Sequence, residues 1–172
     1  MGFVGVPWRA LAKKEGKARF TGVSCHDRPW IKTQIEKYKE QLQVVVTPYT
    51  AATTELPKDS IFEAVKARDV GVFGIKPFAS NSLFKGDSSP NSPQAEEDSK
   101  RARMAIRYIL SNPAITAPIP GLISVAQVDN VVKAVKEGGL TDAEAAEHRL
   151  ACQEMWDRLP PEYCWLKDHR QV

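Results

Sequence analysis

Short apolar segments alternate with longer segments of helical periodicity along this chain, and this alternation limits the possible folds more than any other feature. Four segments rich in β-branched or small apolar residues predict strands, at residues 19–24, 43–47, 70–76 and 115–119. Five segments predict helices, at residues 30–42, 60–67, 99–110, from 124 onward and from 141 to about 158. Because each strand carries few charges and is followed by a helix, the pattern indicates a parallel sheet.

A parallel sheet of this kind fits either an open doubly wound fold or a (β/α) barrel. No Gly-x-Gly-x-x-Gly run follows any predicted strand, which disfavours the dinucleotide-binding doubly wound fold. Residues 80–98 are rich in Ser, Pro, Asn and Gly and predict a long loop after the third strand. Capping-box spacing marks helix starts at Ser60, Ser124 and Thr141.

Composition excludes several classes of function. The 172 residues suffice for one domain with its own core, and 42% hydrophobic and 26% charged residues are typical of a soluble globular protein. A net charge of +3 with scattered basic residues argues against nucleic acid or a membrane surface as a partner. No apolar run reaches the ~18–20 residues that a membrane-spanning helix needs. Residues 1–9 lack the charged and apolar regions of a signal peptide.

The three cysteines, Cys25, Cys152 and Cys164, are odd in number and lack Cys-x-x-Cys spacing. Free thiols in a reducing compartment are therefore expected rather than disulfides or a zinc site, and we expect a cytoplasmic protein without a metal.

The fourth predicted strand leads through Pro120 and Gly121 into the helix that starts at Ser124. Free N–H groups and the helix dipole favour an anion where a strand ends in a tight turn before a helix. This segment is therefore a candidate phosphate-binding site.

Four segments in order carry the motifs of one enzyme family. They are residues 15–24 (EGKARFTGVS), 44–49 (VVVTPY), 71–79 (GVFGIKPFA) and 109–121 (ILSNPAITAPIPG), with 124–130 after the last. Over residues 14–136 the chain resembles the C-terminal half of an aldo/keto reductase. The resemblance implies an oxidoreductase that reduces an aldehyde or ketone with a nicotinamide cofactor, usually NADPH.

The same resemblance implies a partial (β/α)8 TIM barrel, with strands five to eight over residues 1–138 and a helical extension over 139–172. The family's catalytic Asp, Tyr, Lys and His lie in the first half of the barrel and have no counterpart here, so no catalytic residue is expected. A complete barrel needs ~250 residues. We therefore expect a cofactor-binding half, with two alternatives: a non-catalytic half-barrel whose open edges form a homodimer, or a truncated gene fragment.

Five residues match the family's cofactor contacts. Ser24 matches a contact to the nicotinamide carboxamide, and Lys76 lies where a charge would face the pyrophosphate or the substrate. Gly121, Ser124 and Gln127 match the segment that holds the adenosine phosphate. Lys76 could instead cover the barrel rim, and a plain capping box would explain Ser124 and Gln127. The resemblance implies NADP as the cofactor. Because Gln127 stands where an Arg often grips the 2′-phosphate, NAD is the alternative.

Beyond residue 138, two cysteines are too few for an iron–sulfur cluster. The aromatic residues Trp156, Tyr163 and Trp165 are expected to pack an additional helix against the barrel.

Overall fold

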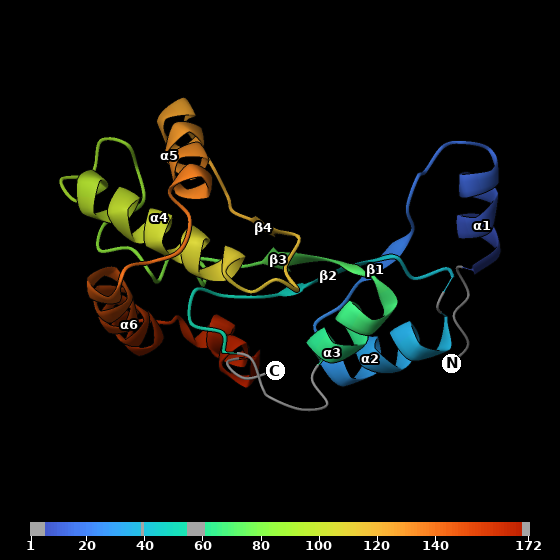
Figure 1. Cartoon of the computed structure of the whole chain (residues 1–172). Coiled ribbons are helices and arrows are strands. Elements are labelled where there is room, and N and C mark those ends of the chain that lie inside the picture. Colours follow the sequence, from blue (N-terminus) through green and yellow to red (C-terminus); the bar gives the residue numbers. More distant parts are fainter. Residues whose placement is uncertain (1–5, 39, 55–60, 170–172) are drawn as a thin grey trace.

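The computed structural model describes residues 6–38, 40–54 and 61–169 of the chain. The elements in these residues are α1 (Val6–Lys14), β1 (Gly22–Ser24), α2 (Arg28–Lys37), β2 (Val44–Pro48), α3 (Ile61–Arg68), β3 (Gly71–Ile75), α4 (Ala95–Leu110), β4 (Ala117–Ile119), α5 (Val125–Glu137), α6 (Asp142–Asp157) and the 3-10 helix η1 (Pro161–His169). Figure 1 shows α2 and α3 side by side along the strands, with α1 and α5 at opposite ends of the sheet.

The four strands form one parallel sheet in the order β1-β2-β3-β4. One row of the register joins Ser24, Val46, Phe73 and Ala117 across all four strands. This confirms the parallel α/β sheet expected from the sequence. Because all strands run in the same direction, their carboxyl ends meet at one edge of the sheet, where polar side chains from separate segments come together.

One face of the sheet packs on α2 and α3. Val45 and Val72 are fully buried there against Ile31, Ile35 and Phe62. The start of α2 is set by Asp27, whose carboxylate accepts a hydrogen bond from the Trp30 N–H at 2.9 Å. Arg28 then donates to the carbonyl of Pro48 and so ties α2 to the end of β2.

A second core joins the carboxyl-terminal helices to the loop after β3. Its largest fully buried members are Leu83, Ile106, Met155 and Leu166, which come from that loop, α4, α6 and η1. Trp156 and Leu159 are buried in the same cluster, and Tyr163 and Trp165 pack at its margin. These aromatic residues therefore pack against α4 and the loop after β3.

Several element boundaries differ from the expected ones. β1 and β4 begin at Gly22 and Ala117 rather than at 19 and 115, because Phe20 is 61% exposed and Ile115 is buried in the preceding turn. The expected loop over 80–98 ends early, since α4 begins at Ala95 and places three acidic residues beside its N-terminal dipole. α1 was not expected.

Two expectations from the sequence concern residues outside the described ranges and the presence of a membrane-spanning helix. The predicted cap at Ser60 lies outside the described residues, as do the first five residues of the N-terminal segment. Among the described residues, no helix is both long enough and apolar enough to cross a membrane.

Candidate functional site

The five predicted cofactor residues all lie at or after the carboxyl ends of strands. Ser24 ends β1, Lys76 follows β3, and Gly121, Ser124 and Gln127 lie between β4 and the first turn of α5. Gly121 and Gln127 line one cavity, whereas Ser24, Lys76 and Ser124 do not line it.

The cavity lies between the β3–α4 loop, the first turns of α4 and the β4–α5 turn. Its volume is about 180 Å³. Phe78, Phe84 and Ile123 give it apolar walls, and Asn81 and Asp98 add polar groups. Sites for whole drug-sized ligands usually occupy ~300–1,000 Å³. This cavity is therefore large enough for one portion of a dinucleotide rather than for all of it.

Gln127 joins the two walls of the cavity. Its side-chain NH2 donates to the carbonyl of Ser88 at 2.8 Å, and its side-chain oxygen accepts from the Ile123 N–H at 2.7 Å. Ser124 caps α5 by accepting from the Gln127 N–H at 3.2 Å. In a complete capping box the Gln127 side chain would accept from the Ser124 N–H, but here it accepts from the Ile123 N–H. Gln127 therefore holds the turn between β4 and α5 beside the cavity.

Left-handed backbone conformations are concentrated in the loop after β3. Lys76, Ala79, Ser80 and Asn81 have φ angles of 61°, 45°, 56° and 67°. Non-glycine residues pay roughly 1–2 kcal/mol for this conformation and keep it only where the surroundings impose it. The loop is thus held in a defined, strained shape beside the cavity.

Asp98, on the first turn of α4, is one of the contacts that hold this loop. The residue is buried, and its carboxylate accepts from the Lys85 N–H at 2.7 Å and from the Gly86 N–H at 3.1 Å. A Cβ at Gly86 would come 2.3 Å from the Ser92 Oγ and 2.9 Å from the Asp98 carboxylate, so any larger residue here would have to displace these side chains.

We expect Asp98→Ala to open this loop to trypsin, which cleaves after lysine and therefore at Lys85. Hydrogen bonds to a charged acceptor contribute about 1.5–3 kcal/mol, so cleavage in the native state should become at least about tenfold faster. The measurement is the rate of native-state cleavage, followed by mass spectrometry. Glu96→Ala, an exposed acid on the same turn, is the control, and equal rates in the two variants would contradict the assigned role.

The extension lies over the ends of β1 and β3. The Trp165 ring stacks on His26, two residues after β1, with centroids 4.4 Å apart and planes at 13°. The Lys76 ammonium lies 5.2 Å from the centroid of the Tyr163 ring. Lys76 thus contacts an aromatic face at the strand ends, whereas Ser24 is exposed at the edge of the sheet.

A buried thiol and imidazole also lie close together, but their environment argues against nucleophilic chemistry. Cys152 Sγ lies 3.4 Å from His148 Nε2, and both atoms approach the carbonyl of Ala51. Burial raises the pKa of Cys152 to about 12 and lowers the pKa of His148, so both side chains are neutral near pH 7. The pair fastens α6 to the segment after β2.

Sequence reasoning missed Asp98, Asn81 and the two phenylalanines of the cavity. Asp98 belongs to the acidic run at 96–98, whose composition is typical of a solvated helix surface. Nothing in the sequence indicated that Gly86 would bind its carboxylate. No group of three His, Cys, Asp or Glu side chains in the described part of the chain is arranged to hold a metal ion.

Fold and cavity together define an α/β protein with a cavity at the carboxyl edge of a parallel sheet. Residues 8–150 match the sequence profile of the Aldo/keto reductase family. The chain therefore belongs to the aldo/keto reductase family. Comparison with curated protein sequences gave no significant match.

Solved aldo-keto reductases have the same fold. The enzyme from Bacillus halodurans matches in its apo form with 22% identity and a TM-score of 0.57, over 85% of this chain and 55% of that one. Its holo form matches with 23% identity and a TM-score of 0.57, over 87% and 54%. A thermostable aldo-keto reductase in complex with the inhibitor epalrestat matches with 18% identity and a TM-score of 0.56, over 85% and 53%. The chain spans about half the length of these relatives.

Proposed function

We propose that the chain is the cofactor-binding half of an NAD(P)H-dependent oxidoreductase of the aldo/keto reductase type, acting on an aldehyde or ketone. One observation carries the proposal: in a member of this family, Gly121 and Gln127 line a cavity at the N-terminus of α5. A helix N-terminus favours phosphate there.

The proposed architecture is a partial (β/α)8 barrel that holds strands five to eight over residues 1–138, with a helical extension over 139–172. The exposure of the sheet supports this proposal. Phe73 and Ile75, on the face away from α2 and α3, are only half-buried, and Ile119 is 47% exposed. Parallel sheets are normally covered on both faces, so this apolar face is one that a complete barrel would enclose.

Each residue has a proposed role toward the cofactor. Gly121, Ser124 and Gln127 bind the adenosine and its phosphate, Lys76 neutralises the pyrophosphate, and Ser24 contacts the carboxamide. The bound dinucleotide supplies hydride. NADP is the proposed form, because the resembled family usually uses NADPH. NAD is the alternative, because the neutral amide of Gln127 cannot form the charge-assisted pair that a 2′-phosphate favours.

The proton donor for carbonyl reduction is proposed to lie outside this chain. The family's catalytic tetrad belongs to the first half of the barrel, and none of its members has a counterpart in the matched motifs. We therefore propose that the chain binds cofactor but does not reduce carbonyl compounds by itself, and that it functions in the cytoplasm, where its three thiols remain reduced.

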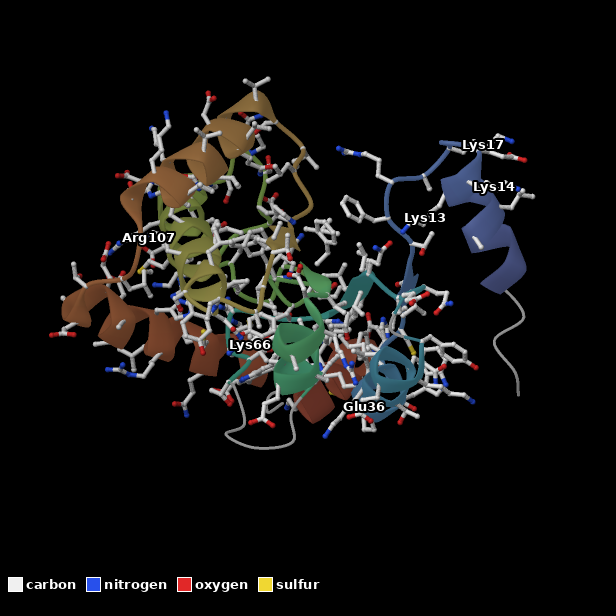
Figure 2. The ribbon with its side chains drawn as sticks, turned by 45° about the vertical axis from the view of Figure 1, so that its right-hand side comes forward. Lys13, Lys14, Lys17, Glu36, Lys66 and Arg107 are labelled. Carbon is white, nitrogen blue, oxygen red and sulfur yellow. The ribbon has the colours of Figure 1, made fainter. Side chains whose placement is uncertain are left out.

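The test is a titration of the purified chain with NADPH and NADH, followed by tryptophan fluorescence. We expect saturable binding without reduction of small aldehydes. Lys76→Met should weaken binding about tenfold through loss of one charge, equivalent to about 1.4 kcal/mol. Lys66→Met, at an exposed residue of α3, is the control (Figure 2). Absence of binding with a cooperative melt would contradict the cofactor role, and carbonyl reduction by the chain alone would contradict the missing proton donor.

A further inference from the structure

A second cavity lies between α6, α4 and the segment that follows β2. Its volume is about 360 Å³, which is about twice that of the cavity at the β4–α5 turn. This volume falls within the ~300–1,000 Å³ that is usual for small-molecule sites. Ala51 and Ala52 form one wall. Tyr108 of α4 forms another, and its hydroxyl is held by donation to the Thr53 carbonyl at 2.8 Å.

Helix α6 supplies two rows of side chains to this cavity, because residues four apart lie on the same side of a helix. The inner row is buried and consists of His148, Cys152 and Trp156. The outer row is exposed and consists of Arg149, Gln153 and Asp157. The inner row gives the cavity a largely apolar and aromatic floor, and the outer row gives it a polar rim with one charge of each sign.

The charges of the rim are available to a ligand. Arg149 and Asp157 have no hydrogen bond or ion pair with any residue that the structure describes. By contrast, the three glutamates of α6 all pair with a basic residue of α4, in the pairs Glu144–Arg107, Glu147–Lys100 and Glu154–Arg101. A rise of 1.5 Å per residue places Arg149 and Asp157 about 12 Å apart along the helix.

The Arg149 end of the cavity favours an anion. His148 Nε2 lies 2.8 Å from the Ala51 carbonyl and donates to it, so Nδ1 of the neutral ring is buried without a partner among the described residues. The groups that face this ring are Tyr108 from α4 and Cys152 and Arg149 from α6. None of them is a carboxylate that could offset the charge of Arg149.

The spacing of the rim charges selects the ligand. The two charged groups of a single amino acid are attached to one carbon atom, so they cannot reach both Arg149 and Asp157. Three extended residues span roughly 10–11 Å, which is close to the separation along α6. An apolar side chain between the two charged ends would lie against the rings of Tyr108 and Trp156.

We propose that this cavity binds a short free peptide of about three residues. The carboxylate of the peptide binds Arg149, its ammonium group binds Asp157, and its central side chain contacts Tyr108 and Trp156. The proposal does not depend on the cofactor role, because none of the five predicted cofactor residues lines this cavity.

Calorimetric titration of the full chain with the tripeptide glycyl-phenylalanyl-glycine tests the proposal. We expect saturable one-to-one binding that saturating NADPH does not change. Arg149→Met and Asp157→Asn should each weaken binding about fivefold, because each removes one partly hydrated charge pair. Arg68→Met, at an exposed arginine of α3, is the matched control and should bind like wild type. Melting temperatures should be unchanged in the three variants, since all three side chains are exposed.

Two further measurements locate the peptide. The N-acetylated and C-amidated form of the same tripeptide lacks both charges and should not bind saturably. Burial and then the charge of Arg149 lower the pKa of His148. A carboxylate bound at Arg149 offsets this charge, so the His148 imidazole signal, followed by NMR, should titrate at a higher pH when the peptide is present.

Four results would overturn the proposal. They are no saturable binding by the wild-type chain, equal binding of the blocked peptide, equal affinities of Arg149→Met and Arg68→Met, and competition between the peptide and NADPH. The last result would place the peptide in the cofactor cavity. The cofactor role stands or falls separately, because the NADPH titration measures it without the peptide.

Discussion

Gly22→Ala should unfold the chain more readily than any other single methyl addition described here. Gly22 lies in β1 opposite Val44, and a Cβ at this position would come 2.0 Å from the Val44 carbonyl oxygen and 2.8 Å from its Cβ. The obstacle is backbone of the neighbouring strand and cannot rotate away, so β1 must separate from β2. Overpacking usually costs 1–3 kcal/mol, and here we expect about 3 kcal/mol or more.

The free energy of unfolding, measured by urea denaturation, tests this expectation. Gly139→Ala is the matched control, because a Cβ at Gly139 has no atom within 4 Å and its φ is not left-handed. That variant should unfold within about 0.5 kcal/mol of wild type. If Gly22→Ala were equally stable, β1 could not pair with β2 in the observed register.

Arg107→Met should have the second largest effect, because Arg107 ties the turn between α5 and α6 to α4 (Figure 2). Its side chain is 7% exposed, donates to both oxygens of Glu144 at 2.6 and 3.0 Å, and donates to the carbonyls of Gly138 and Gly139. Removing it leaves these acceptors without their partner. Because the Glu144 side chain is 32% exposed and so partly hydrated, we expect the free energy of unfolding to fall by about 2–3 kcal/mol.

The same contact makes the stability depend on pH. Hydrogen bonding from Arg107, with a smaller contribution from Thr141, lowers the pKa of Glu144 from its ordinary 4.5 to about 2. A carboxyl group with a lowered pKa stabilises the folded state fully above its unfolded pKa. That contribution is lost as the pH falls through the folded value. Wild type should therefore lose stability between about pH 4.5 and 2.

Unfolding free energies at pH 7, 4.5 and 3 for wild type, Arg107→Met and Arg103→Met provide the check. Arg103 lies on the same helix but donates to the neutral Asn130 side chain, so its variant should keep the acid sensitivity. Arg107→Met should retain less of it. The remaining slope is expected from Glu97 and Glu154, because hydrogen bonds from Arg101 lower the pKa of both groups. An unchanged slope in Arg107→Met would show that Glu144 does not carry the effect.

The sheet could be predicted from sequence because its signal is local. Val45 and Val72 belong to short apolar runs bounded by turn residues, and each run is followed by a helical period. The strand ends were less predictable. Ile115 resembles a strand residue, yet it is buried in the turn before β4, and hydrophobicity does not distinguish these two ways of burying a side chain.

Only part of the candidate site was accessible in this way. Gly121 and Gln127 were predicted as cofactor residues, and both line one cavity because they lie close together in sequence, between the end of β4 and the first turn of α5. The opposite wall comes from Asn81 and Asp98, which reach the cavity through a strained loop and a carboxylate that binds backbone N–H groups. Contacts of a side chain with distant backbone N–H groups depend on the path of the loop, and this path cannot be predicted from the composition of the segment. The stacking of Trp165 on His26 was equally unpredictable, because it joins distant parts of the chain.

The sequential strand order also bears on how the chain reaches its structure. Each strand pairs only with the strand before or after it in the sequence, so every ladder closes across one crossover. Each strand pairing therefore closes only one loop, with a small entropy cost, and the contact order stays low for a parallel sheet. Assembly can begin at any β-α-β unit and extend in either direction, as in repeat proteins. On this view, whole units could be added at β1 or β4 without breaking a single existing pair.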